Sequence, residues 1–268
     1  MIFFKLNFGS ISDKNPDEAE NVAQTYLASL CHDGQIYKEY FLFPQNGCLC
    51  AYMKALGSQA LSMKYHSERG AEDLKKVIAF FGKAPEKNQM SDNARKRDVT
   101  WKNAPFLYLF THAFDDESPL CRGDNGRPVP VYRLKYASCE RSEIYRWQCT
   151  YRELDSIWLD SGKLEIPAYK LLAEPDGELA LAGREICARI EKTTGIPTYY
   201  YLMRYWGRKK NEEKRKCPGC GRSWHKYNMI EQEYEIPDFF FQCDRCRLVS
   251  SIASNFEDER HAVIGDRR

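Results

Sequence analysis

Four cysteines in the last quarter of the sequence form two Cys-x-x-Cys pairs. The pairs are Cys217–Cys220 and Cys243–Cys246, with 22 residues between them. Two thiolates at this spacing can reach one ion from a single tight turn, and zinc prefers a tetrahedron of sulfur ligands at about 2.3 Å. Pro218 and Gly219 suit such a turn, because proline fixes φ and glycine lets backbone N–H groups point at sulfur. The spacing therefore predicts one structural zinc ion held by Cys217, Cys220, Cys243 and Cys246.

A disulfide pair, a redox dithiol and buried thiols without a partner are the other uses of such cysteines. A redox Cys-x-x-Cys normally follows a strand and opens a helix, whereas a charged run precedes Cys217. His225 could replace one thiolate, but with four thiols present we expect it at the surface. Aromatic and β-branched residues flank both pairs, so each pair is predicted to cap a short hairpin, as in a zinc ribbon.

A run of basic residues leads into the first cysteine pair. Cations placed against phosphates release counterions, which gives an affinity for nucleic acid that does not depend on base sequence. Trp206 and Trp224 lie within and beyond the run, where an exposed indole could stack on an unpaired base. The residues predicted to contact nucleic acid are Arg204, Arg208, Lys209, Lys210, Lys214, Arg215, Lys216, Arg222, Trp224 and Lys226.

Two other interpretations of this region stay open. Most charge runs are solvated surface or linker, and Glu212 and Glu213 interrupt this one. Between the cysteine pairs, an acidic stretch limits the basic surface to one side and could serve a basic protein partner. Its residues are Glu231, Glu233, Glu235 and Asp238. A protein-interaction module, such as an adaptor or a toxin neutraliser, is therefore the alternative to nucleic-acid binding.

Composition indicates a soluble globular protein. Of the 268 residues, 29% are charged and 43% are hydrophobic. No stretch approaches the ~20 apolar residues of a membrane span, and the first residues lack the features of a signal peptide. Eleven cysteines, four of them spaced as metal ligands, fit a reducing cytoplasm better than a disulfide framework. The net charge of +2 means that attraction to nucleic acid must come from local charge.

The N-terminal third predicts the order β-α-β-β-α-β. This order suggests a ferredoxin-like sandwich, an antiparallel sheet with two helices on one face. Asn15 and Pro16 mark the start of the first helix, and Asn46-Gly47 favours a hairpin turn. We expect Tyr37, Tyr40 and Phe41 in the core or at an edge, because an RNA-binding motif run is absent. The elements are strands at 2–8, 36–43, 48–53 and 106–110, and helices after Asn15 and near 71–81.

The middle of the chain predicts a further α+β region. It has a strand at 131–134, a short helix around Tyr151 to Trp158, a longer helix over 176–194, and the β-prone run Tyr199 to Met203. The predicted division is a ferredoxin-like domain at 1–115, an α+β middle region at 116–206, and a zinc ribbon with its basic approach at 207–268. The fold class is α+β.

Other groups in the sequence give weaker signals of a functional site than the four cysteines do. Asp115-Asp116-Glu117 resembles a cation or acid/base cluster, but consecutive residues point apart and we expect solvated loop acids. Cys48 and Cys50 share one face of a strand and are predicted to be ordinary thiols. Signatures of nucleophilic catalysis and of phosphate-binding loops are missing from the sequence, which argues against an enzyme.

Three motifs together carry a resemblance to a family. They are Gly195-Ile196-Pro197 with Tyr199-Tyr200-Tyr201-Leu202, Cys217-Pro218-Gly219-Cys220-Gly221 with Trp224, and Cys243-x-x-Cys246-Arg247-Leu248-Val249-Ser250. They resemble an uncharacterised proteobacterial zinc-ribbon family for which nucleic-acid binding has been suggested. The resemblance implies a C-terminal zinc ribbon with these four cysteines as ligands and no established activity.

Overall fold

The computed structural model describes residues 2–90, 100–115, 117–136, 138–224 and 239–267. The chain forms two compact units whose segments alternate along the sequence. The first unit contains residues 1–100, 116–118 and 128–146, and the second contains residues 101–115, 119–127 and 147–268. This division differs from the three consecutive segments that the sequence suggested. Each unit is mixed α+β and has its own sheet, as the predicted fold class requires.

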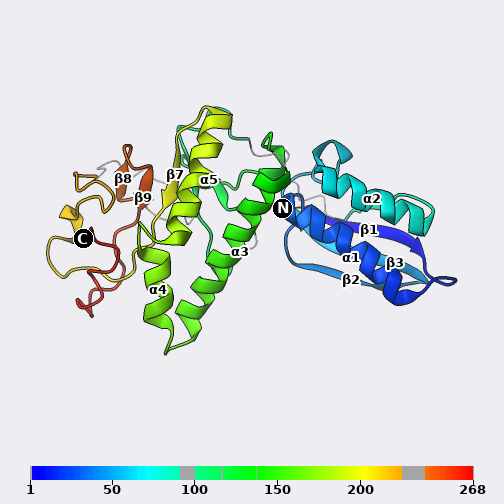
Figure 1. The fold of residues 1–268 in the computed structure, drawn as a ribbon, viewed down its shortest axis with the longest axis horizontal. Helices are drawn as coiled ribbons and strands as arrows, with labels where there is room; N and C mark the ends of the chain where they lie inside the picture. Colours follow the sequence, from blue (N-terminus) through cyan, green and yellow to red (C-terminus); the bar gives the residue numbers. More distant parts are fainter. Residues whose placement is uncertain (1, 91–99, 116, 137, 225–238, 268) are drawn as a thin grey trace. The chain divides into compact units, whose positions relative to one another are not determined.

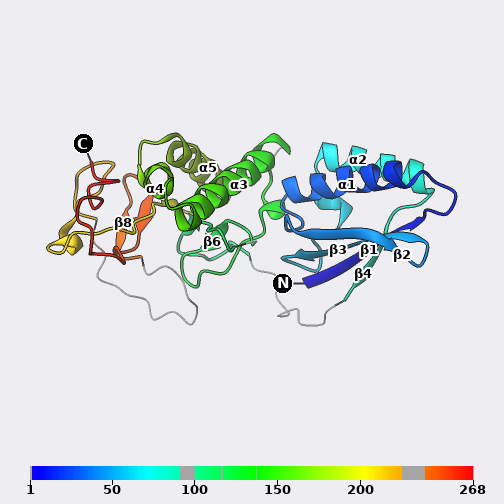
Figure 2. The ribbon, with the colours of Figure 1, turned by 90° about the horizontal axis from the view of Figure 1, so that it is seen from below.

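The first unit contains the predicted order β-α-β-β-α-β. Its elements are β1 (Ile2–Ser10), α1 (Pro16–His32), β2 (Tyr40–Gln45), β3 (Cys48–Ala55), α2 (Glu68–Phe81) and β4 (Glu86–Gln89). The strands pair antiparallel in the order β2-β3-β1-β4. Figure 2 shows α1 and α2 on the same face of this sheet. Phe4, Leu6 and Phe8 of β1 point to that face and are buried in the core with apolar side chains of both helices.

The sequence signals for the start of the first helix and for the first hairpin turn are confirmed. The Asn15 side chain accepts hydrogen bonds from the backbone N–H groups of Asp17 and Glu18, at 3.0 and 3.3 Å. Pro16 occupies the first helical position, where its missing N–H costs nothing. The Asn46-Gly47 turn also joins β2 and β3 as predicted, with positive φ at both residues.

The prediction that residues 106–110 supply the last strand of this sheet is wrong. That segment forms β5 (Leu107–Leu109), which is buried on both faces in the second unit. The last strand of the first sheet is instead β4, whose sequence is Glu-Lys-Asn-Gln. β4 is held by backbone pairing with β1 and not by apolar burial, so it leaves no hydrophobic signal in the sequence.

The second unit is built on a five-stranded sheet. Its strands are β5, β6 (Leu120–Arg122), β7 (Thr198–Tyr201), β8 (Phe241–Cys243) and β9 (Leu248–Ser250), in the order β6-β5-β7-β9-β8. β7 pairs parallel with both β5 and β9, and the remaining pairs are antiparallel. The hairpin that carries the second cysteine pair is therefore part of the same sheet as β7 (Figure 1).

Three helices belong wholly or partly to this unit. They are α3 (Ser138–Asp160), α4 (Glu165–Ala173) and α5 (Glu178–Thr194). α3 is much longer than the predicted helix near residues 151–158, and α4 was not predicted. α5 is confirmed, and it ends at Gly195 in the left-handed conformation. Gly183 allows α5 to approach β7 closely, since a Cβ there would lie 2.3 Å from the ring of Tyr200.

The predicted strand at 131–134 is also wrong. Residues Val131–Arg133 form one 3₁₀ turn that follows Pro130. The backbone N–H of Leu134 donates to the carbonyl of Val131 at 3.0 Å, which closes the turn where a strand would pair with a neighbour. Among the described residues, no helix has the length and apolar character needed to cross a membrane.

Candidate metal centre and adjacent basic segment

The first cysteine pair sits in a tight loop that its own backbone hydrogen bonds close. Cys217 N–H donates to the carbonyl of Arg222 at 2.8 Å, and Gly221 N–H donates to the carbonyl of Cys217 at 2.7 Å. Gly221 has a φ of +69°, which favours glycine. A Cβ on Gly219 would lie 2.9 Å from Cys246 Sγ. The two glycines thus let the loop approach the second pair closely.

The second pair lies at the turn between β8 and β9, as the hairpin prediction required. Cys243 ends β8 and pairs with Leu248 of β9. Arg247 anchors this hairpin to α5, because its guanidinium donates to both carboxylate oxygens of Glu191, at 2.7 and 2.9 Å. Asp244 accepts a hydrogen bond from the hydroxyl of Tyr199 on β7 at 2.6 Å. The hairpin is therefore fixed to the sheet and to a helix of the same unit.

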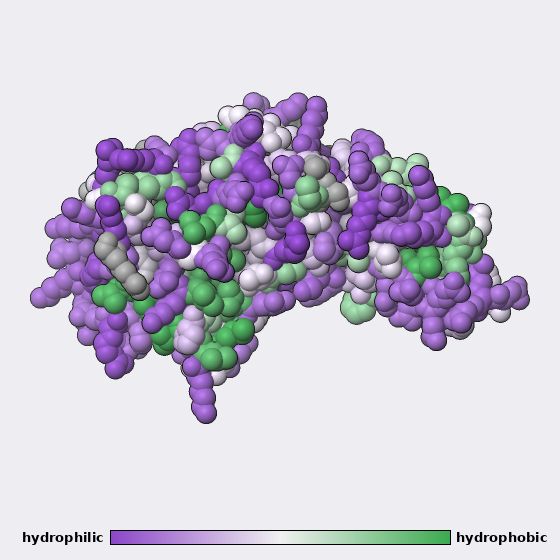
Figure 3. Space-filling model, viewed as in Figure 1, coloured by the Kyte–Doolittle hydropathy of each residue, from purple (hydrophilic) through white to green (hydrophobic). Residues whose placement is uncertain are grey.

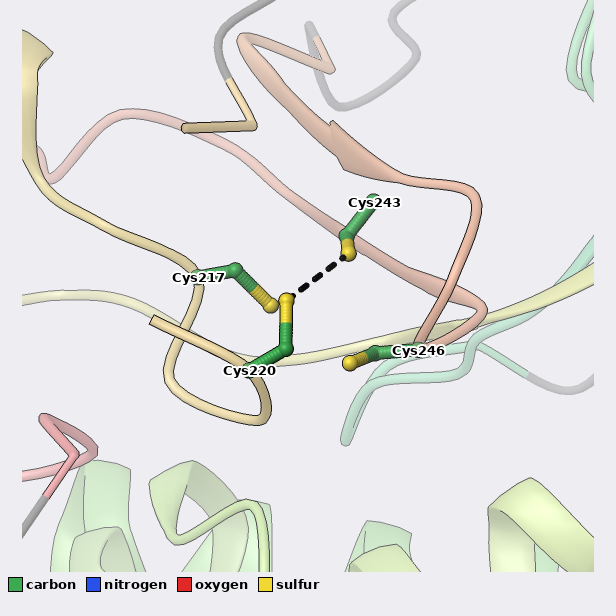
Figure 4. A group of neighbouring side chains, drawn as sticks. All are labelled: Cys217, Cys220, Cys243 and Cys246. Atoms are coloured by element: carbon green, nitrogen blue, oxygen red, sulfur yellow. Dashed lines mark hydrogen bonds between the residues drawn. The ribbon is translucent and has the colours of Figure 1, made fainter. Parts of the chain in front are cut away.

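These two turns bring four sulfur atoms together (Figure 4). The Sγ atoms of Cys217, Cys220, Cys243 and Cys246 all lie within 4.8 Å of one another, and Cys220 Sγ is 3.7 Å from Cys243 Sγ. Sulfurs at the corners of a tetrahedron with metal–sulfur bonds of about 2.3 Å stand about 3.8 Å apart. The arrangement therefore fits one ion that prefers four sulfur ligands.

The thiols differ in their surroundings. Burial raises the pKa of Cys217, and it raises the pKa of Cys246 to about 11. The backbone N–H of Arg222 lowers the pKa of Cys220 to about 7. A metal ion binds the thiolate form, so occupation of the site must release protons.

Arg204 and Arg215 of the predicted interface are buried and occupied in the protein interior. Arg204 donates to both carboxylate oxygens of Glu212, at 2.9 and 3.2 Å, and to the carbonyl of Ile264 at 3.0 Å. The Arg215 guanidinium lies 5.0 Å from the ring centres of both Trp224 and Phe241. Only 4% of Arg204 and 6% of Arg215 are exposed. Both arginines are therefore removed from the candidate interface.

Glu212 neutralises these two arginines. Its carboxylate is 2% exposed and also accepts the backbone N–H of Arg208 at 3.0 Å. Burial raises the pKa of Glu212, but the hydrogen bonds from Arg204 and Arg208 outweigh it, so the pKa lies below its usual value. In the sequence this residue looks like one of two adjacent acids, Glu212 and Glu213, that interrupt a basic run. Its position between Arg204 and Arg215 does not distinguish it from the exposed Glu213, so the sequence carried no signal of this buried ion pair.

The prediction that Trp224 contacts nucleic acid is also wrong. Its indole is 2% exposed, stacks on Phe241 with ring centres 4.9 Å apart, and donates from Nε1 to the carbonyl of Arg215 at 2.9 Å. Trp206 is also buried, against Tyr169. Neither indole offers a face to a base, because both rings are buried against other aromatic side chains.

The remaining cations of the segment reach the surface. Arg208 is half-buried and forms an ion pair with Asp266. Lys226, His225 and the acidic stretch at 231–238 lie outside the described residues. The exposed cations are Lys209, Lys210, Lys214, Lys216 and Arg222. We refer to these five as the basic rim.

The other predicted groups do not form a second site in the described part of the chain. Asp115 and Glu117 are half-buried rather than fully solvated. Cys48 is half-buried and Cys50 buried, and they join no larger group of described ligands. A cavity of 880 Å³ lies beside Pro218 and Gly219, but its lining includes charges of both signs, such as Lys170, Asp176 and Asp266. This mixed lining does not select a polyanion.

Comparisons with known proteins cover most of the second unit. Residues 102–203 match the family described as "Domain of unknown function (DUF2310)", and residues 207–256 match "Domain of unknown function (DUF8594)". An uncharacterised protein of Haemophilus influenzae is 35% identical over 150 residues, which are 55% of this chain and 71% of that protein. The chain belongs to the same uncharacterised bacterial family as this Haemophilus influenzae protein. All four clustered cysteines lie in the region that matches DUF8594.

Two further matches were found. A second family member, also an uncharacterised protein of Haemophilus influenzae, is 35% identical over 163 residues, which are 59% of this chain. The match spans only 60% of that relative's length. A crystal structure of an antibiotic biosynthesis monooxygenase aligns with 34% of this chain and 97% of its own, at 14% identity and a TM-score of 0.26.

Proposed function

We propose that the four cysteines hold one structural zinc ion and that the basic rim beside them binds nucleic acid. The sulfur cluster supports zinc, because four thiolates in a tetrahedron suit this ion and the sulfur separations match. In this proposal the first unit is a ferredoxin-like sandwich and the cysteine loops form a zinc ribbon. When bound, zinc would cross-link the loop at Cys217 to the β8–β9 hairpin.

The zinc site is structural rather than catalytic in this proposal. Four protein ligands leave no coordination position for water or substrate, so the ion would not act as a Lewis acid. The proposed function is non-enzymatic binding, in which the ion has no catalytic role. Thiolate ligands must stay reduced, which supports a cytoplasmic location.

The observation that carries nucleic-acid binding is the contrast between buried and exposed cations in one segment. Arg204 and Arg215 are neutralised inside by Glu212, whereas the five cations of the basic rim face solvent. The segment is thus held in place by its buried arginines, and its free charges are presented on a fixed backbone. A backbone that is already ordered loses little further conformational entropy when phosphates bind, so only the rim side chains must be immobilised.

The test is the salt dependence of nucleic-acid binding by the zinc-loaded full chain. The variant Lys209→Gln/Lys210→Gln/Lys214→Gln/Lys216→Gln removes four rim charges. We expect weaker binding and a slope of log affinity against log salt that is flatter by about 3 to 4. The matched control, Lys64→Gln/Lys75→Gln/Lys163→Gln/Lys192→Gln, removes four exposed lysines elsewhere. Equal losses in both variants would remove the basic rim from the proposal.

A protein partner is a second candidate, favoured by an apolar patch in the second unit. Figure 3 shows apolar residues, coloured green, over α4 and the end of α3, where Leu159, Leu164 and Leu171 are 43%, 54% and 51% exposed. Contiguous apolar patches often mark interaction sites. A partner retained through nuclease and high salt, and lost in Leu164→Asp/Leu171→Asp, would support this function over nucleic-acid binding.

A further inference from the structure

A stretch of chain beyond β9 lies alongside the residues that lead into the basic rim. The backbone N–H of Gly207 donates to the carbonyl of Asn255 at 2.8 Å. Farther along the same stretch, the carbonyl of Ile264 accepts a hydrogen bond from the buried Arg204 at 3.0 Å. These two contacts fix the stretch against the start of the basic run. We call residues 255–267 the flanking segment.

The flanking segment places carboxylates against two consecutive residues of the basic run. Asp266 forms an ion pair with Arg208, whose side chain is 40% exposed. Glu259 is exposed, and its carboxylate accepts the backbone N–H of Lys209 at 3.0 Å. Lys209 is the first cation of the basic rim. Negative charge is therefore built into the border of the rim.

Arg208 has the position and the donors to join the basic rim, but a carboxylate occupies it. Within the described part of the chain, its guanidinium bonds only to Asp266. Its backbone N–H is held by Glu212 at 3.0 Å, directly before Lys209. A guanidinium pairs with carboxylate and phosphate in the same fork geometry. Asp266 thus takes the place that a phosphate would have on Arg208.

Asp266 is a fixed part of the fold rather than a mobile counterion. Its Oδ1 lies 3.5 Å from Nη1 of the buried Arg204. Ala262 and Ile264 of the flanking segment are buried, which holds the backbone on either side of the carboxylate's reach. A partner on the same chain competes at a constant and high effective concentration. A phosphate from solution must therefore compete with Asp266 for Arg208.

We infer that the flanking segment restrains nucleic-acid binding at the basic rim. Asp266 withholds Arg208 from phosphates, and Glu259 repels phosphates that approach Lys209. The inference rests on the proposed nucleic-acid function and adds to it a limit on affinity that is built into the fold. Removal of either carboxylate should strengthen binding. Loss of a merely structural contact would have the opposite effect or none.

The experiment measures binding of the zinc-loaded full chain to a labelled DNA duplex and to labelled oligo(U) RNA. At about 0.15 M salt, Asp266→Asn should tighten binding about fivefold and steepen the salt slope by about 1, because one more cation contacts phosphate. In an Arg208→Gln background, Asp266→Asn should change affinity by less than about twofold, since the two residues act as a pair.

A second variant tests the repulsion by itself. Glu259→Gln keeps an oxygen that can accept the Lys209 N–H but removes the charge, and it should tighten binding about twofold. Because Glu259 lies at the surface, this variant tests the inference even where Asp266→Asn does not fold. Zinc content and circular dichroism should match the wild type in each variant that is compared.

The controls separate the restraint from the proposed function. Asp13→Asn/Glu72→Gln removes two exposed acids of the first unit and should bind as the wild type does. An equal gain in that control would overturn the restraint, because net charge alone would explain the effect. Unchanged affinity in Asp266→Asn and in Glu259→Gln, with weaker binding in the rim variant, would overturn the restraint and leave the basic rim standing. Absence of binding by the wild type and by both acid variants would overturn both.

Discussion

Glu212 holds two buried arginines in place within the basic segment. Its carboxylate is bonded to Arg204 and lies 3.8 Å from Arg215 Nε, and all three side chains are almost fully buried. Removing one partner of a buried ion pair leaves an uncompensated charge, which costs more than the pair itself contributes. The conformation of the segment next to Cys217 should therefore depend on this one acid.

Replacement of Glu212 tests that dependence. Glu212→Gln should lower the free energy of unfolding of the second unit by up to roughly 3–5 kcal/mol, because Arg204 and Arg215 would lose their buried anion. Only the more exposed carboxylate of Asp266, 3.5 Å from Arg204, would remain near them. The matched control is Glu213→Gln, since Glu213 is exposed and should change stability by about 0.5 kcal/mol or less. Denaturant unfolding followed by tryptophan fluorescence measures both, since all five tryptophans belong to the second unit. Similar small effects in the two variants would contradict the role of Glu212.

A second residue-scale prediction concerns His66 in the first unit. Its Nε2 lies 2.9 Å from the Tyr26 hydroxyl, and burial lowers the pKa of His66 below its usual value of 6.5, with Lys87 adding to the effect. The folded state therefore favours the neutral imidazole. Its contribution to stability should be fully present above about pH 6.5 and should be lost as the pH falls through the lowered pKa.

The measurement compares urea midpoints at neutral and mildly acidic pH for the wild type and His66→Gln. The variant should lose less stability on acidification, because one group that charges on unfolding is gone. Some loss should remain, since burial also lowers the pKa of His32. His112→Gln, at an exposed histidine of the second unit, is the control. An identical acid loss in His66→Gln and the wild type would contradict the prediction.

At the scale of elements, the loop of the first cysteine pair depends on glycine. A Cβ on Gly219 would lie 2.9 Å from Cys246 Sγ, closer than such atoms normally approach. Gly219→Ala should therefore weaken zinc binding about 5- to 150-fold, which corresponds to roughly 1–3 kcal/mol of overpacking. Competition with a chromophoric chelator measures the affinity. Ser223→Ala, at a nearby exposed position, should bind zinc as the wild type does.

The elements that could be predicted are those with strong local signals. Asn15 and Pro16 predicted the start of α1, and Gly195 predicted the end of α5. The Cys-x-x-Cys spacing predicted that both cysteine loops would meet. β4 could not be predicted from hydrophobic pattern, because it contains no apolar residue and is held by backbone pairing with β1. Burial of Arg204, Arg215 and Trp224 was also hidden, since it depends on Glu212 and Phe241 meeting them in space.

At the scale of the whole molecule, the cysteine loops are not an appended module. β9 follows the second cysteine pair and adds to β7 in parallel, so the hairpin forms one side of the five-stranded sheet. The first unit has a separate core around β1, β3, α1 and α2. Loss of zinc should therefore disturb the second unit while the first unit stays folded.

Limited proteolysis with mass spectrometry tests that separation. After removal of zinc by a chelator, cleavage should increase within residues 198–267, and peptides from β1, α1 and α2 should stay protected. Addition of zinc should restore the original pattern. Uniform loss of protection in both units would show that their stabilities are coupled, in contradiction to the separate cores.

The most direct measurement is the zinc content of the purified chain. We predict one zinc ion per chain in the wild type and loss of that ion in Cys217→Ser, with exposed Ser58→Ala as a control that keeps it. The reason is that four thiolates at tetrahedral separations form one complete site and three do not. A full equivalent of zinc retained in Cys217→Ser, or a wild type that binds no zinc, would contradict the metal centre.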